Sequence, residues 1–315
     1  MSINSLPPEL LRQIVEASIP HSYRSATYPR RQRTLSNLCL VSNLFRQIAQ
    51  PLLLEIVEIE TEKGFEKLHR WLSARDRIDA DVKTLICSSW ERPREWLNIG
   101  ALDKLSAVCP AVSALTFNVY GSDQLSLELL SSFRHLSDLH LYGLSFPTTS
   151  SLTNLRSLTL SDFQAISTFL SKSGSIVPPL LRYLALTDVE DAFHKNPVSK
   201  FSILARLLPQ LEAWSIEVDG LKDAYASGGY SILRPYFSRA LVELPLWSHE
   251  YELDLSNVFK DIQHLRYLHK FDEDALEILV DDITLILESP STRRASVPSI
   301  SIEFREGTVR TSGGG

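Results

Sequence analysis

Apolar residues recur at helical spacing in two stretches near the start of the chain. The first stretch follows a proline pair, whose fixed φ suits a first helical turn. Its apolar positions are Leu10, Leu11, Ile14 and Val15. The second has 3-4-3-4 spacing, at Leu38, Val41, Phe45, Ile48 and Leu52. Ser42 falls midway and suits a helix N-cap, so the pattern predicts two helices meeting there, with Pro51 ending or kinking the last.

These helices form a module of fewer than sixty residues, in which a polar, basic insert (residues 21–34) separates the two stretches. Three short helices of this size make a marginal core by themselves. Part of the apolar surface is therefore expected to be shared with a neighbour. The alternative is that both stripes pack on the rest of this chain.

A different pattern repeats through the remainder of the chain. Its unit has apolar residues at the first, fourth and sixth positions, as expected of a buried strand. The copies are residues 82–87, 112–117, 136–141, 155–160, 181–186, 211–216 and 241–246, with weaker ones at 262–267 and 297–302. The central residues of the seven stronger copies lie 19 to 30 positions apart. That spacing allows one strand and one helix per unit, so the pattern predicts an α/β body.

Features between the strands support this organisation. Pro110, Pro179 and Pro209 each precede a strand copy by two residues, where proline ends a helix and imposes an extended lead-in. Helices are predicted at 65–72, 125–133, 166–170 and 201–208. A further acidic helix, 272–289, is expected to close the C-terminal end of the stack.

Composition narrows the function classes. The net charge of −6 gives no reason to expect nucleic acid or an anionic membrane as the main partner. The three scattered cysteines are expected to be buried thiols, and the histidines and cysteines lack metal-ligand spacing. No phosphate-binding glycine loop or Gly-x-Ser-x-Gly elbow occurs. The chain is therefore expected to be a non-enzyme without metal or cofactor. With no secretory signal and no bilayer-spanning segment expected, it is placed in the cytoplasm, the nucleus or both.

The N-terminal order, LPPELLRQIV followed after a gap by LCLVSNLFRQIAQPLLLEIV, resembles the F-box motif in the form common in fungal proteins. This resemblance implies docking onto the Skp-type adaptor of an SCF-type (cullin–RING) ubiquitin ligase. Carried over by position, the docking residues are Leu6, Pro7, Pro8, Leu10, Ile14, Leu38, Val41 and Phe45. Phe45 stands where many members have tryptophan. The gap is longer than usual in the family and is interpreted as an exposed loop.

The body resembles a leucine-rich repeat, the usual companion of this type of F-box. It departs from the strict pattern, because Leu144, Phe163 and Val189 replace the asparagine or cysteine after the strand. The resemblance implies an irregular α/β solenoid with parallel strands on one side and helices on the other. The expected divisions are an F-box at residues 1–60, a repeat region at 61–289, and a C-terminal strand and disordered tail at 290–315.

Strand alternation selects the residues that would face the concave surface and meet a protein target. They are Asp138, His140, Tyr142, Tyr183, Thr187, Glu217, Glu243 and Trp247. Each of them could instead be an ordinary solvated strand position. The chain then acts as a substrate receptor that holds an unidentified protein near the ligase, or as a scaffold that keeps the adaptor contact without directing degradation. Arg293-Arg294 ahead of Ser296 matches a basophilic kinase site.

Overall fold

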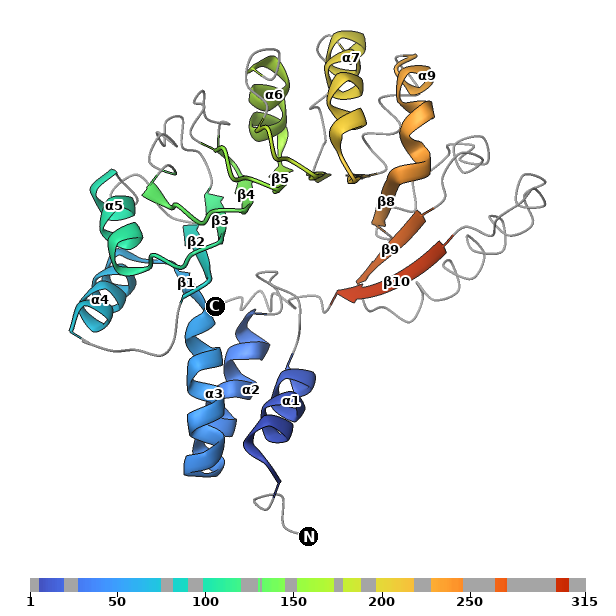
Figure 1. Ribbon diagram of the computed structural model, residues 1–315. Helices are drawn as coiled ribbons and strands as arrows, with labels where there is room; N and C mark the ends of the chain where they lie inside the picture. Colours follow the sequence, from blue (N-terminus) through green and yellow to red (C-terminus); the bar gives the residue numbers. More distant parts are fainter. Residues whose placement is uncertain are drawn as a thin grey trace, which may run out of the picture. The chain divides into compact units, whose positions relative to one another are not determined.

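The computed structural model is an α/β protein in which every described pair of neighbouring strands is parallel. It describes residues 6–19, 28–74, 82–89, 99–119, 130, 132–144, 152–172, 178–187, 197–217, 228–245, 264–270 and 299–305. The chain divides into two compact units, Met1–Leu144 and Ser145–Gly315. Each unit is treated by itself below (Figure 1).

The first unit begins with three helices, as predicted. They are α1 (Pro8–Ser18), α2 (Tyr28–Val41) and α3 (Asn43–Glu55). Ser42 caps α3, because its hydroxyl accepts a hydrogen bond of 3.2 Å from the Phe45 N–H. One face of each helix contributes to a shared apolar core. Its buried members are Leu11, Val15, Ile19, Leu35, Phe45, Ala49 and Leu52.

The interpretation of the insert as a loop is wrong, because α2 already begins at Tyr28 and half of the insert is helical. Of the two alternatives for Pro51, ending the last helix is wrong as well, because α3 continues to Glu55. Pro51 has no N–H and therefore costs the helix one intrahelical hydrogen bond. The helix continues past it, because the flanking apolar residues still pack in the core.

A parallel sheet follows directly from α3. Its strands are β1 (Ile56–Ile59), β2 (Thr84–Ser89), β3 (Ala114–Val119) and β4 (Asp138–Tyr142), and they pair in chain order. The helices α4 (Glu62–Ser73) and α5 (Ile99–Val108) connect successive strands. The central residues of the predicted copies, Leu85, Leu115 and Leu139, are aligned in register and buried. Strand β1 lies inside the expected N-terminal division, residues 1–60, where no strand was predicted, and ends just before that boundary.

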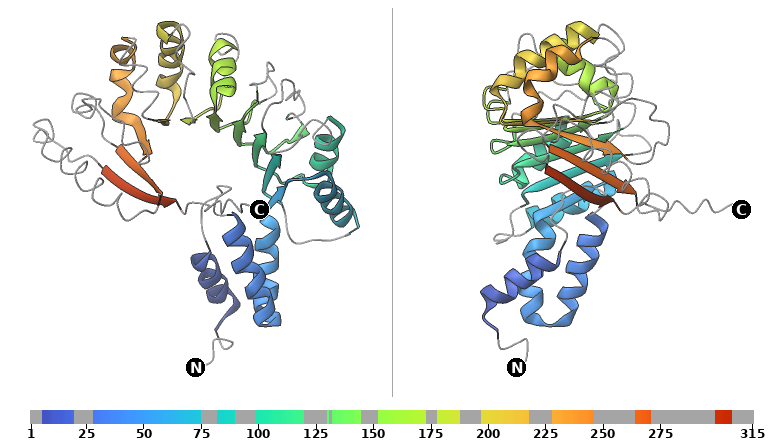
Figure 2. Two further views of the ribbon diagram at one scale, coloured as in Figure 1. Left: turned by 180° about the vertical axis from the view of Figure 1, so that it is seen from behind. Right: turned by 90° about the vertical axis from the view of Figure 1, so that its right-hand side faces the viewer.

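The second unit repeats the same arrangement. Its strands are β5 (Ser157–Ser161), β6 (Tyr183–Thr187), β7 (Ala213–Glu217), β8 (Ala240–Pro245), β9 (His264–Lys270) and β10 (Ser299–Arg305). The intervening helices are α6 (Phe163–Lys172), α7 (Pro197–Leu207), η3 (Leu208–Gln210), α9 (Tyr230–Leu233) and η4 (Arg234–Arg239). In both figures α6, α7 and α9 lie on one side of these strands (Figures 1 and 2).

Each predicted strand copy overlaps an observed strand. The central residues Leu158, Leu184 and Trp214 are aligned in register. This alignment of central residues stops at β8, because Trp214 pairs with Ala240 and not with Leu244. The reason is local: η4 runs straight into β8, so that strand starts without the extended lead-in of the other repeats.

A tight turn precedes the strand in five of the repeats. The first apolar residue of the copy donates its N–H to the carbonyl three residues earlier, at 3.1 to 3.3 Å. This bond occurs at Val112, Leu136, Leu155, Leu181 and Leu211. The two residues that follow then donate to one carbonyl of the preceding strand's lead-in, as at Ser113 and Ala114 onto Lys83. The turn satisfies backbone groups that would otherwise be buried without partners.

The helix predictions at 65–72, 166–170 and 201–208 are confirmed by α4, α6, and α7 with η3. The one at 125–133 falls largely outside the described residues, as does all of 272–289. Helix α5 was not predicted. Among the residues that the structure describes, no helix is long and apolar enough to cross a bilayer.

Two adjacent glycines offer a matched test of packing in the second unit. A Cβ on Gly229 would lie 2.2 Å from Cδ2 of the buried Phe201 ring. A Cβ on Gly228 would meet nothing within 4 Å, but the backbone of Gly228 has a φ of +75°, which is unfavourable for alanine. We expect Gly229→Ala to lower the free energy of unfolding by about 1–3 kcal/mol through overpacking. Gly228→Ala should cost about 1 kcal/mol through backbone strain alone. Gly229→Ala should be the more costly of the two. Urea unfolding measures both, and a cost for Gly229→Ala no larger than that for Gly228→Ala would contradict the steric argument.

Candidate functional site

The apolar stripe of α1 is divided between core and surface. Leu11 and Val15 are buried in the module's core. Leu10 and Ile14, one turn apart, remain 46% and 45% exposed. Two large aliphatic side chains on one face of a helix are thus left without cover from the described residues.

A second exposed pair lies where α2 ends. Leu40 is 79% exposed and Val41 is 64% exposed, immediately before the Ser42 cap of α3. Leu40 was missed by the sequence analysis, because it falls outside the apolar stripe. That displacement is itself a usable signal, since an aliphatic residue off the stripe at a helix end has no core to enter.

The beginning of α1 and the connection between α2 and α3 lie at the same end of the helical module, the end away from β1 (Figures 1 and 2). Pro7 and Pro8, at the start of α1, are exposed as well. We refer to the exposed prolines and large aliphatic residues of α1, of its lead-in and of the end of α2 as the exposed apolar set. It comprises Pro7, Pro8, Leu10, Ile14, Leu40 and Val41.

The other three predicted docking residues lie differently. Leu6 and Leu38 are half-buried and pack against the core of the module. Phe45 is only 5% exposed and belongs to that core. The prediction that Phe45 belongs to the docking surface is therefore wrong for the free chain, because its ring is buried. Its aromatic side chain fills the space that α1, α2 and α3 enclose.

The predicted target-binding residues of the first unit lie together on β4. Asp138 is exposed, and His140 and Tyr142 are half-buried. They alternate with Leu139 and Leu141, which are buried, and so occupy the opposite face of the sheet. In register beside them on β3 stand Ala114, Thr116 and Asn118. This polar face was found by strand alternation alone.

The same face carries a hydrogen-bonded group on β1 to β3. The Ser88 hydroxyl donates to Oε1 of Glu58 at 2.9 Å, and the Asn118 amide donates to the Ser88 oxygen at 3.4 Å. Burial raises the pKa of Glu58 above its usual value, the Ser88 bond opposes that rise, and the nearby Glu60 charge adds to it. None of these residues was singled out from the sequence.

The raised pKa of Glu58 predicts a pH-dependent stability. The folded state holds this proton more tightly than the unfolded chain, so the stabilisation is present at low pH. It is lost as the pH rises from the unfolded value of 4.5 through the folded pKa. We therefore expect the Tm of Glu58→Gln, relative to wild type, to increase between pH 4 and pH 7. Glu66→Gln, on an exposed face of α4, serves as control, and parallel profiles for wild type and Glu58→Gln would contradict this.

The remaining predicted residues are distributed over the second unit. Tyr183 is half-buried on β6, next to Ser157 in register. Thr187 ends β6, and its hydroxyl lies 2.6 Å from that of Ser161. Glu217 of β7 is the register partner of Glu243 of β8. Two predicted residues, Trp247 and the candidate phosphorylation site Ser296, lie outside the described residues.

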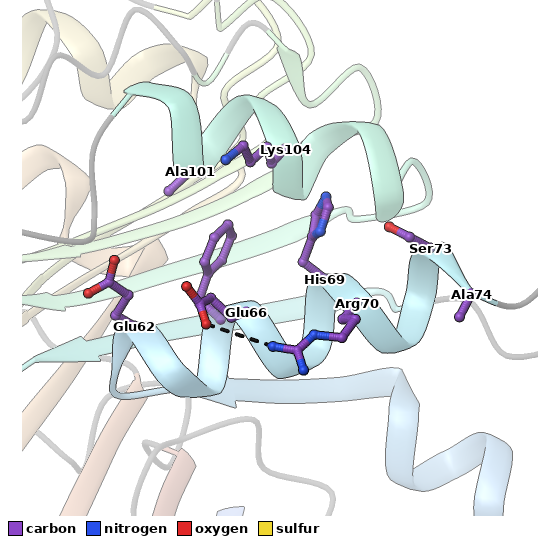
Figure 3. A pocket seen from close by; sticks show the side chains of 9 residues that line it. Glu62, Glu66, His69, Arg70, Ser73, Ala74, Ala101 and Lys104 are labelled. Atoms are coloured by element: carbon purple, nitrogen blue, oxygen red, sulfur yellow. Dashed lines mark ion pairs between the residues drawn. The ribbon is translucent and has the colours of Figure 1, made fainter.

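A pocket of about 640 Å³ lies between α4 and α5 in the first unit (Figure 3). Its lining residues are Glu62, Phe65, Glu66, His69, Arg70, Ser73, Ala74, Ala101 and Lys104. Glu66 and Arg70 form an ion pair of 3.8 Å along α4. Charges of both signs line the pocket, so it has no net preference for an anion or a cation.

The cysteines are free thiols without an activating environment. Burial raises the pKa of Cys87 and of Cys109 to about 12, and that of half-buried Cys39 is raised as well. Cys87 and Cys109 are therefore protonated at neutral pH and poor nucleophiles. Within the described ranges, no group of three or more His, Cys, Asp or Glu side chains is arranged to hold a metal ion.

The first unit therefore carries two candidate binding surfaces, the exposed apolar set on its three-helix module and the polar face of its sheet. Comparison with known proteins adds no assignment, because neither a family model nor a curated protein matches the chain.

Proposed function

We propose that this chain is a substrate-receptor subunit of an SCF-type cullin–RING ubiquitin ligase and catalyses no reaction itself. The helical module would be its F-box, and the parallel-strand body would be a leucine-rich-repeat-like solenoid that holds the target. The observation that carries the proposal is the exposure of Leu10, Ile14 and Val41, which the motif resemblance independently assigns to adaptor docking.

Physical chemistry supports a protein partner for this set. Large aliphatic side chains that stay exposed on a small module favour burial against another protein. Each Leu, Ile or Val side chain that is removed from water on binding contributes favourable free energy in proportion to the apolar area buried. The module keeps its own packed core around Phe45 and Leu35, so it presents these side chains without unfolding.

The polar face of β4 is our candidate for target recognition in the first unit. Asp138, His140 and Tyr142 project from a strand whose alternate residues are buried, and this holds their backbone in place. A pre-organised row of polar and aromatic side chains loses little entropy when it binds a peptide segment. Holding a target beside the ubiquitin-conjugating enzyme raises its effective concentration, which requires no chemistry from this chain.

The test is direct association with a purified Skp-type adaptor. The full chain, mixed with the adaptor, is expected to elute as a 1:1 complex in size-exclusion chromatography and to give saturable binding by calorimetry. An unrelated protein of similar size and charge serves as the control partner. Absence of a complex at micromolar concentrations of both proteins would contradict the proposal.

A further inference from the structure

The polar insert between the two halves of the helical motif contacts the first strand of the sheet. Strand β1 pairs with β2 along one edge. Along its backbone, the Gln32 amide donates to the Ile56 carbonyl at 3.1 Å, and the Glu58 N–H donates to the Tyr28 hydroxyl at 3.1 Å. Ile56 and Glu58 are two residues apart and so present their polar groups to the same edge of the strand. Side chains of α2 thus satisfy backbone groups that an edge strand leaves unpaired.

The same turn of α2 also holds the end of α3. Gln32 donates a second bond, of 3.2 Å, to the Leu53 carbonyl. Arg31, which is buried, donates from Nη2 to the Leu52 carbonyl and to Oε2 of Glu55, both at 3.3 Å. The last carbonyls of a helix lack intrahelical partners, so these donors complete the C-terminus of α3 where it becomes β1.

Glu55 extends this connection to the next strand. Its Oε1 forms an ion pair of 2.8 Å with Lys83, and its carbonyl accepts a 2.9 Å bond from the Lys83 N–H. Lys83 immediately precedes β2. The contacts therefore run from α2 through the end of α3 to two strands, and all of them cross the point where the module meets the sheet.

We propose that Tyr28, Arg31 and Gln32 form an edge clamp, which fixes the direction in which the β1–β4 sheet leaves the helical module. The three residues occupy positions i, i+3 and i+4 of α2 and so share one face of that helix. The consequence for ubiquitin transfer rests on the proposed function: with the module fixed to its adaptor, the clamp sets where the polar face of β4 points. Tyr28, Arg31 and Gln32 are thus positioning residues.

The experiment measures the angle between module and sheet through a distance distribution. Spin labels are attached at Gln47→Cys on α3 and Lys104→Cys on α5, which are both exposed, in a Cys39→Ser background. Cys87 and Cys109 are buried and do not accept label. The test variant is Tyr28→Phe with Gln32→Ala. It removes three hydrogen bonds and leaves the Arg31–Glu55 pair in place, so it avoids a buried unpaired carboxylate and is expected to fold.

Pulsed electron resonance should show one narrow distance in the parent and a distribution at least about twofold wider in the test variant. The Glu58 amide should also exchange about tenfold faster, because its acceptor is lost and one such bond is worth roughly a factor of ten in local opening. Arg33→Ala, at an exposed neighbouring position of α2, is the control and should leave both measurements unchanged.

An unchanged distance distribution in the test variant overturns the clamp, whatever the exchange rate does. The clamp and the proposed function fail separately, because the distance is measured on the free chain. If the adaptor does not bind the parent protein but the distribution widens, the ligase assignment falls and the clamp stands. If the adaptor binds parent and variant equally and the distance distribution is unchanged, the clamp falls and the ligase assignment stands.

Discussion

Glutamate at both Leu10 and Ile14 is expected to weaken adaptor binding by at least about a hundredfold while the chain stays folded. Both side chains are about half exposed in the free protein, so the module's core loses little. On docking, each would carry a charge into an apolar contact, where an unpaired charge costs several kcal/mol. The variant also forgoes the burial of two aliphatic side chains, which is worth about 1.5–3 kcal/mol for each side chain that is fully buried. Calorimetric titration with the purified adaptor measures the loss.

Gln47→Glu with Gln50→Glu is the matched control, since it adds the same two charges at exposed polar positions of α3. It should bind the adaptor like wild type. Undiminished binding by the Leu10 and Ile14 variant would show that the exposed apolar set is not the docking surface. Phe45 is unsuitable for this test, because its ring is buried and a charge there would unfold the module.

Trp214→Ala is expected to lower the free energy of unfolding of the second unit by about 3–5 kcal/mol. The indole is 1% exposed and stacks on Phe237 at a centroid distance of 5.6 Å. Its Nε1–H donates to the Tyr236 carbonyl at 3.2 Å. Truncation therefore leaves a large cavity and removes the partner of a carbonyl. Hydrogen exchange of the β6 and β7 amides, measured in the full chain at increasing denaturant concentration, gives this loss of unfolding free energy.

The comparison is Trp71→Ala on α4, where the indole is half-buried. It should cost less than half as much, because less apolar area is lost from contact. Equal losses for the two variants would mean that burial in the strand core is not what stabilises the second unit. A loss confined to the amides of the first unit would also contradict the prediction.

The strands of the body could be predicted because their signal is local. Where the structure describes their side chains, alternate apolar residues of the copies enter the core, and a tight turn precedes five of these strands. Leu85, Leu115 and Leu139 therefore line up without knowledge of any distant contact. Asp138, His140 and Tyr142 followed from the same alternation. Each of these inferences needed only the two-residue period of a strand.

Other features depended on partners remote in the sequence. Strand β1 reads as a continuation of α3 until β2 is placed beside it, 28 residues later in the register. The insert reads as a polar loop, yet its buried Arg31 completes the end of α3. The register of β8 shifted because η4 enters it directly. A periodic pattern contains no information about any of these contacts.

The residues themselves determined most of the helices and strands, because apolar periodicity and capping act within a few residues; α5, β1 and the first half of α2 are the exceptions. Only the tertiary structure decided which apolar side chains remain exposed. Leu11 and Phe45 enter the core while Leu10 and Val41 stay in solvent, although all four belong to apolar stripes. The reason is geometric: three helices enclose one space, and its volume is filled before every apolar side chain has been buried.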